Sequence, residues 1–459
     1  MATGLPRYIL PFFIAVIFLL LHNINAETVH AQPSITGDYQ LLIGTAFAHP
    51  SELLPGVQRL SLNLDNRFDD GRFFARADIR NRFEASADSM EWALPELWLE
   101  LFFPNSDLRI GRQNLQLGLA VANAPVDRIQ PLDLRNFLLE PFSNLQRGTI
   151  ALSYSFYTGN SRFRMILAPV HTPSLIPETD SKWFPHLPVP AGLSVYIEPA
   201  SNKQPSSLNP QAALIWDTSV LRSVDFQAGI LYWKPSMPAY KKSFQLTTPG
   251  SLLPDPFVML QETFTPTTIA TGGVSWQTTS SLNILLEAAW FEKIAYDKIP
   301  EELLSIDTAS PDLFRLPRFV SIIMDETEDF ISHHSATDIL LEMRYSRSNA
   351  QIGIQWYNQL IKNPHPDVIQ DTWFQSITTF TSWSFFRDRL VSDLTFSYQV
   401  NGKDFWIRTE HSYDIADDVT FSAGAHFFGG PVPKVNYGHP SFGSYRSNSL
   451  AFAGVRYYF

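Results

Sequence analysis

The sequence contains no cysteine, and it has no internal apolar run long enough to form a membrane helix. The chain therefore has no disulfide framework, which is compatible with export through an oxidising compartment. The missing apolar run argues against a helical inner-membrane protein. Positive charge is also scarce, because 34 Lys and Arg face 45 Asp and Glu and leave a net charge of -11. This balance argues against a nucleic-acid binder.

The N-terminus has the features of an export signal. Arg7 supplies the positive charge, and the apolar stretch 9–21 that follows is too short to span a bilayer easily. Small residues at cleavage spacing end at Ala26 or at Ala31, and both sites stay open. We expect residues 1–26, or 1–31, to be a signal peptide, with a retained anchor helix as the alternative. Residues 37–459 are then expected to form one domain.

The most abundant pattern in the chain is alternation of apolar and polar side chains. In residues 72–85, Phe73, Ala75, Ala77 and Ile79 share one face, and charged side chains occupy most of the other. A period of two indicates a β-strand. Eighteen such segments can be traced, and sixteen remains open if two are misassigned. The longest connections, at about 171–208, 235–263 and 295–334, all fall on one side of the resulting sheet.

The last segment, residues 450–459, decides between a soluble and a membrane sheet. Phe459, Tyr457, Val455 and Ala453 form a wholly apolar face with two aromatics at its foot, which fits a lipid-facing surface. A sheet in a bilayer must close on itself, because lipid offers no hydrogen bonds to an open edge. We therefore expect an all-β transmembrane antiparallel barrel in the outer membrane, in contact with its lipid, with short periplasmic turns and long outer loops.

Aromatic residues make up 14% of the chain, and many lie near the ends of the expected strands. We interpret these as two interfacial girdles. They are Trp98, Phe102, Tyr157, Tyr232, Trp233, Trp290, Phe291, Trp356, Tyr357, Trp383 and Phe386.

Charged side chains of three segments fall on faces that we expect to line the lumen. They are Arg72, Arg76, Asp78, Arg80, Arg82, Glu96, Glu100, Arg162 and Arg164. An arginine ladder that faces carboxylates across a pore selects solutes by charge. The alternative is that these charges neutralise one another and hydrate a plugged lumen. Later segments add Asp338, Glu342, Asp393 and Glu410, so the preferred ion sign stays open.

A β-strand that ends at a C-terminal Phe resembles the closing strand of Gram-negative outer-membrane barrels, which implies recognition by the barrel-assembly machinery. Gly111-Arg112-Gln113, followed by Asp127 and by Pro131-Leu132-Asp133-Leu134, resembles porin-like outer-membrane families of poorly known function. The strand end is also loosely similar to that of alginate-export-type barrels. The resemblance implies a loop folded into the barrel, where Arg112, Asp127, Arg128, Asp133 and Arg135 line a constriction. An ordinary surface loop is the alternative.

A catalytic site is poorly supported. His439, Ser441, Ser444 and Ser447 share one outer loop, but no family-type spacing of nucleophile and base is present. The adjacent pair His333-His334 lacks acidic ligands at metal-binding spacing. We therefore expect no enzyme, no metal and no cofactor.

The predicted function is passive diffusion of small polar or charged solutes through an outer-membrane porin-like channel. A loop-plugged structural or adhesive barrel is the first alternative, and an outer-membrane hydrolase is the second. A TonB-dependent receptor is disfavoured, because the chain has no separate N-terminal plug domain. The oligomeric state stays open.

Overall fold

The computed structural model describes residues 33–48, 53–82, 90–120, 123–135, 140, 142–177, 181–184, 194–198, 209–245, 257–299, 330–432 and 441–459. The expected signal peptide lies outside these residues, so it stays a prediction. Within the described part of the chain, no helix is both long and apolar enough to cross a bilayer.

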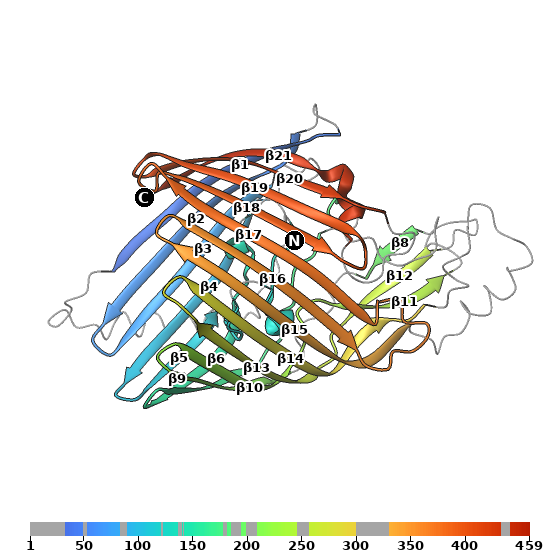
Figure 1. Ribbon diagram of the computed structural model, residues 1–459, viewed down its shortest axis with the longest axis horizontal. Coiled ribbons are helices and arrows are strands. Elements are labelled where there is room, and N and C mark those ends of the chain that lie inside the picture. The colour runs from blue at the N-terminus through green and yellow to red at the C-terminus, as the bar shows by residue number, and fades with distance from the viewer. Residues whose placement is uncertain are drawn as a thin grey trace, which may run out of the picture.

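An 18-stranded antiparallel sheet closes into a barrel (Figure 1). Its strands are β1 (Ser34–Ala46), β2 (Leu53–Phe68), β3 (Gly71–Arg82), β4 (Met90–Phe103), β5 (Ser106–Gln113), β6 (Thr149–Thr158), β7 (Ser161–Ala168), β9 (Gln211–Leu221), β10 (Val224–Trp233), β13 (Thr267–Gln277), β14 (Leu282–Asp297), β15 (Ile331–Arg347), β16 (Ala350–Ile361), β17 (Trp373–Phe385), β18 (Leu390–Gln399), β19 (Asp404–Ala416), β20 (Val419–Gly429) and β21 (Leu450–Tyr458). Strand β21 pairs with β1 in a register that runs from Asp38 opposite Tyr458 to Ala46 opposite Leu450. The closed sheet confirms the expected all-β barrel with eighteen strands instead of sixteen.

The two ends of the barrel differ in the length of their connections. At one end every turn is short; the shortest turns resemble residues 69–70 between β2 and β3, and the longest resemble residues 278–281 between β13 and β14. At the other end the connections are mostly long. The turn between β6 and β7 places Gly159 at φ 54, a left-handed conformation that glycine adopts without strain. Because short turns of such barrels are periplasmic, we call this end the periplasmic end and the opposite end the outer end.

The outward face of the barrel carries large apolar side chains that are exposed. Leu62, Leu214, Ile230, Leu286 and Ile354 expose between 38% and 55% of their surface. A continuous band of this kind is unstable in water and fits the acyl chains of a bilayer. The predicted lipid-facing surface is therefore present.

The expected aromatic girdles are only partly confirmed. Tyr232, Trp290, Trp356, Trp383 and Phe386 are exposed at the outer surface of the barrel, whereas Tyr157 lines a cavity in the lumen and Phe102 lies on the inward face of β4. By contrast, Trp98, Trp233 and Phe291 are buried, and Tyr357 donates a hydrogen bond from its hydroxyl to Asp338 at 2.7 Å. The reason is that neighbouring residues of a strand point to opposite faces, so each pair of adjacent aromatics must divide between lipid and lumen.

Two long outer connections contain strands that the sequence analysis treated as loop. Strands β8 (Ser194–Ile197), β11 (Ala239–Gln245) and β12 (Phe257–Thr263) form a small sheet beyond the outer rim (Figure 1). Strand β8 pairs in parallel with β12. Lys242 on β11 is buried and forms an ion pair with Asp297 at the end of β14, which joins the small sheet to the barrel. These strands were missed because they are short and β8 pairs only with a distant part of the chain.

Candidate functional site

The described residues of the segment 114–148, which we call the inward loop, leave the barrel wall after β5 and reach across the lumen. They include the short helices η1 (Pro125–Ile129) and α2 (Phe142–Leu145). The first part of the loop contacts inward side chains of β14, β15 and β16, and the second part contacts those of β2, β3 and β4. These two groups of strands lie on opposite sides of the barrel (Figure 1). The expectation that one loop folds inward is confirmed.

Hydrogen bonds hold the first part of the loop to β14 and β16. The backbone N–H groups of Leu119 and Ala120 donate to Glu287 Oε2 at 2.9 and 3.0 Å. The Asn123 side-chain amide donates to Gln355 Oε1 at 2.9 Å. Glu287 is fully buried, so its carboxylate depends on these two donors to replace lost hydration.

Arg128 holds the loop to β15. Its Nε lies 3.4 Å from Oδ2 of the buried Asp338, and its guanidinium lies over the ring of Phe291. Burial lowers the pKa of Arg128, but Asp338, Tyr357 and Tyr296 together outweigh this effect and keep that pKa above its ordinary value. Tyr357 and Gln359 also donate to Asp338, at 2.7 and 3.0 Å. Arg128 is therefore fixed against the wall by its ion pair with Asp338 and by its contact with the Phe291 ring.

Apolar side chains fill the space between the loop and this wall. Leu117, Ala124, Val126 and Ile129 of the loop belong to one buried cluster with inward residues of β6 to β16. The wall side of this cluster includes Ile166, Ile215, Leu231, Trp233, Ile269, Phe291 and Leu340. Burying each such side chain stabilises the fold by roughly 1.5–3 kcal/mol. The inward face of these strands is thus apolar where this cluster lies, because a covered wall is a protein core and not a water-facing surface.

An ionic network holds the second part of the loop to β3 and β4. Arg80 lies 3.0 Å from Asp133 and 3.2 Å from Asp78, and it also donates to the Asn144 carbonyl at 3.2 Å. Arg135 lies 2.7 Å from Asp133 and 2.9 Å from Glu91. Arg80, Asp133 and Arg135 therefore bridge the loop to the wall, in addition to any role in a pore.

A second buried ion pair lies on β2. Arg59 is 3.3 Å from Glu140 of the inward loop and 3.6 Å from Asp38 of β1. Both Arg59 and Glu140 expose only 1% of their side chains. The sequence analysis missed this pair, although Arg59 alternates in step with the other inward residues of β2.

The predicted ladder on β3 exists, but its partners differ from those expected. Arg72 lies directly across from Glu100, and Arg76 from Glu96, as antiparallel pairing of β3 and β4 predicts. Arg72 nevertheless forms its ion pair with Asp65 of β2 at 2.7 Å. The strand on the other side of β3 thus competes for the same guanidinium.

The remaining charges of this group are also paired locally. Arg76 lies 3.1 Å from Asp78 on its own strand. Glu100 binds Arg109 of β5 at 2.7 Å, and Glu96 accepts a hydrogen bond from the Trp98 indole at 3.2 Å. This side of the lumen is therefore a mixed network and not a row of free arginines.

Arg162 and Arg164 of β7 share one carboxylate. Both lie close to Asp217 of β9, at 3.0 and 3.2 Å. Asp217 was not predicted, although it is the only charged residue in the segment 211–218. An inward carboxylate next to two inward arginines could have been found from strand order alone.

Of three further predicted residues, the structure describes the side chain of Arg112 alone. Arg112 donates to the Leu94 carbonyl at 3.2 Å. The side chains of Arg82 and Asp127 lie outside the described residues.

Arg147, at the end of the inward loop, is a missed member of the cation cluster. Its Nη1 donates to the Pro173 carbonyl at 2.5 Å. Burial lowers the pKa of Arg147 to about 10; Asp133 opposes this, while the charges of Arg112, Arg135 and Arg80 add to it. Asp133 and the three arginines Arg80, Arg112 and Arg135 thus lie near enough to Arg147 to act on its charge.

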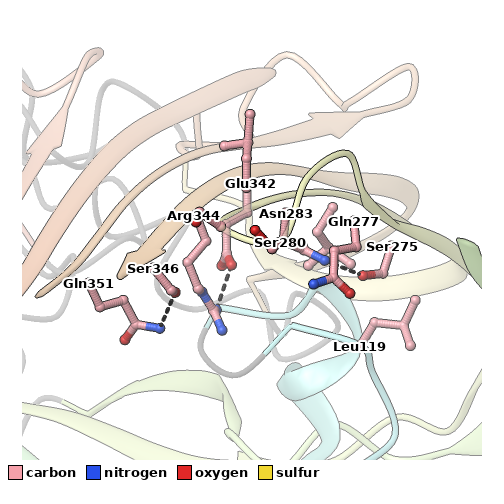
Figure 2. A pocket seen from close by; sticks show the side chains of 12 residues that line it. Leu119, Ser275, Gln277, Ser280, Asn283, Glu342, Arg344, Ser346 and Gln351 are labelled. Carbon is pink, nitrogen blue, oxygen red and sulfur yellow. Dashed lines mark hydrogen bonds and ion pairs between the residues drawn. The ribbon is translucent and has the colours of Figure 1, made fainter. Parts of the chain in front are cut away.

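Two cavities lie on the periplasmic side of the inward loop. The first, which we call the neutral cavity, has a volume of about 350 Å³ (Figure 2). Its lining is Leu119, Ser275, Gln277, Ser280, Ser281, Leu282, Asn283, Leu285, Glu342, Arg344, Ser346 and Gln351. The second, which we call the ionic cavity, has a volume of about 280 Å³ and is lined by residues that include the predicted Glu100, Arg162 and Arg164.

Strands β17 to β20 form a side of the lumen without the apolar core of the opposite wall. Thr378, Ser382, Ser412 and Ser422 alternate on the inward face and are partly exposed. Thr378 and Ser397 share a hydrogen bond at 3.0 Å across β17 and β18. On β19, Arg408 pairs with Glu410, and both side chains keep partial exposure. This wall is polar and accessible, in the way that water-filled lumens require.

The candidate catalytic residues are not arranged as a catalytic site within the described residues. Ser441 donates its hydroxyl hydrogen to the buried Asp404 at 2.6 Å, and His439 lies outside the described part. His333 contacts Thr265, and His334 contacts Ser332. In the described ranges, no group of three or more His, Asp or Glu side chains is placed to hold a metal ion.

Known proteins resemble this chain in fold alone. No family model and no curated protein matches the sequence. The outer membrane protein OpdK of Pseudomonas aeruginosa superposes with a TM-score of 0.52 at 6% identity, over 93% of this chain and 99% of that one. OccAB4 of Acinetobacter baumannii superposes with a TM-score of 0.50 at 9% identity, over 94% and 99%. The chain has the fold of an outer-membrane porin-like barrel. Together with its lipid-facing apolar band, this fold is that of a protein of the outer membrane.

Proposed function

We propose that the protein is an outer-membrane channel through which small polar or charged solutes diffuse passively, and that the inward loop forms its constriction. The observation that carries the proposal is the asymmetry of the lumen. The loop packs tightly against β6 to β16, whereas β17 to β20 present accessible hydroxyl and charged side chains. A lumen with one covered wall and one wet wall leaves an aqueous path beside the loop.

Conductance of the purified protein in a planar bilayer tests this proposal. We expect stepwise current increases whose size rises with salt concentration. Bilayers that stay closed at all salt concentrations would end the channel proposal. They would leave the plugged structural or adhesive barrel in its place.

That alternative has an observation of its own. At the outer end, Trp183, Phe428, Leu450 and Phe452 form a buried cluster inside the barrel, and Tyr445 packs against it. This cluster narrows the outer mouth of the lumen, and the inward loop narrows the lumen at a second level. A barrel closed at both levels would serve as an envelope component without transport.

Charge selectivity is the first property to test. Replacing Arg76 by glutamate reverses a partly exposed charge in the network on β3. We expect the ratio of cation to anion permeability to rise by roughly twofold or more, because the lumen potential becomes more negative. The reversal potential in a salt gradient measures this ratio.

Arg222→Glu is the matched control. Arg222 is exposed in the periplasmic turn between β9 and β10, so the substitution changes the net charge equally without changing the lumen wall. Equal shifts in both variants would assign selectivity to the overall charge of the protein and remove Arg76 from the argument.

The proposal also includes the expected export and membrane assembly of the protein. Recognition of the last strand by the barrel-assembly machinery and cleavage of the signal peptide stay predictions. The oligomeric state stays open.

A further inference from the structure

We propose that the neutral cavity binds an uncharged polyhydroxylated solute, such as a monosaccharide or a sugar alcohol. This inference rests on the proposed channel for delivery of the solute, but binding itself can be measured without conduction. The proposal depends on three features of the cavity, which are its place, its hydrogen-bonding groups and its balance of charge.

The cavity lies between the inward loop and the periplasmic rim. Leu119 of the loop forms one side, and Ser280 and Ser281 of the turn between β13 and β14 form another (Figure 2). Its volume of about 350 Å³ falls in the range of small-molecule sites. A solute that passes the loop on this side would meet the cavity before it reaches the periplasm.

The polar lining consists mainly of amides and hydroxyls. The Asn283 amide donates to Ser275 Oγ at 2.9 Å, which leaves the Asn283 carbonyl oxygen as an acceptor. Gln351 reaches Ser346 only at 3.4 Å. Gln277 is exposed to the cavity, and its side chain makes no hydrogen bond to any described residue. Such a set offers donors and acceptors together, as hydroxyl groups of a polyol require, because each hydroxyl both donates and accepts.

The charges of the cavity are already compensated. Arg344 lies 2.5 Å from Glu342, and its guanidinium also lies over the ring of Phe380. Glu342 accepts a further hydrogen bond from the Gln355 amide at 2.6 Å. The pair has no net charge to attract an ion, yet its remaining hydrogen-bonding capacity can serve a neutral hydroxyl. Leu282 and Leu285 add apolar surface, against which the C–H groups of a sugar can pack.

The ionic cavity provides the contrast. It contains Arg109, Arg162 and Arg164 with Glu100 and Asp107, so it favours charged solutes. The two cavities share no lining residue and therefore predict different ligands. Sorbitol and gluconate separate them, because the two share a polyol chain and differ only at C1, where gluconate carries a carboxylate.

Isothermal titration calorimetry on the detergent-solubilised full chain tests the inference, with sorbitol, glucose and gluconate as probes. We expect glucose and sorbitol to bind with millimolar dissociation constants. In the double variant Gln277→Leu, Gln351→Leu, affinity for glucose should fall about tenfold, because two hydrogen-bonding side chains are lost. Gluconate affinity should change less than twofold in the same variant.

Gln116→Leu is the matched control, since Gln116 is an exposed glutamine of the ionic cavity. It should leave glucose affinity unchanged within twofold. If the double variant does not reach the compact electrophoretic mobility of a folded barrel, each single variant serves instead, with a loss of about threefold.

The outcomes separate this inference from the proposed function. Salt-dependent conductance without glucose or sorbitol binding would overturn the neutral site and leave the channel standing. Glucose binding in a protein that never conducts would support the site and refute the channel. Preferential binding of gluconate, or glucose binding that the double variant does not weaken, would also overturn the inference.

Discussion

Replacing Asp338 by leucine should destabilise the barrel and raise its conductance. The substitution leaves the half-buried Arg128 without its carboxylate, and it removes the acceptor of Tyr357 and Gln359. Removing one partner of a fully buried ion pair costs about 3–5 kcal/mol, and the partial exposure of Arg128 places the expected cost below that range. We expect the first part of the inward loop to leave the wall, so that the thermal midpoint falls and the single-channel current becomes larger and noisier. Gel mobility after stepwise heating and bilayer recording measure the two effects.

The double variant Arg128→Met, Asp338→Leu is the decisive control. With both charges replaced by apolar side chains, no uncompensated charge stays buried, and the adjoining cluster around Phe291 can accept them. The thermal midpoint should therefore recover most of its loss relative to Asp338→Leu alone. A double variant as unstable as the single one would show that the ion pair is not what holds the loop. Unchanged conductance in Asp338→Leu would show that the loop is not the constriction.

Replacing Arg80 by methionine should both release the second part of the inward loop and alter the charge selectivity of the channel. Arg80 contacts Asp133, Asp78 and the Asn144 carbonyl, and it exposes only 8% of its side chain. Arg76 and Arg135 still neutralise part of the charge that the lost arginine leaves. We expect a loss of about 2–4 kcal/mol and a shift of the reversal potential toward cations.

Arg80→Lys separates anchoring from charge. Lysine keeps the positive charge but cannot reproduce the planar guanidinium contacts with two carboxylates. It should lower the thermal midpoint while the reversal potential stays near that of the parent protein. If lysine shifted the reversal potential as far as methionine does, loop position would set selectivity, and the charge of Arg80 would not.

The sequence was informative wherever side-chain direction depends only on the strand. Alternation predicted the eighteen strands, the apolar band and the inward direction of Arg72, Arg76 and Arg80. The same rule, applied strictly, would have divided Trp290 from Phe291, which the girdle interpretation placed together. The girdle interpretation was wrong for Phe291 because it used only the position of a residue along its strand. It neglected whether the side chain points inward or outward.

The candidate site was predicted less completely, because pairing in a lumen has several solutions. Arg72 could meet Glu100 on one neighbouring strand or Asp65 on the other, and it binds Asp65. Arg162 and Arg164 were found, but their shared Asp217 was not. Each inward charge was readable in the sequence, whereas the choice of partner depends on competing distances in the folded barrel.

By itself, the amino-acid sequence determined that the chain is a lipid-embedded barrel and which face of each strand looks inward, because alternation is a local property of extended backbone. Only the tertiary structure decided which inward faces are wet. That decision rests on contacts between remote segments, such as the hydrogen bond from Asn123 to Gln355, whose positions differ by 232 residues. No local pattern records such a contact, because it exists only after the sheet has closed around the loop.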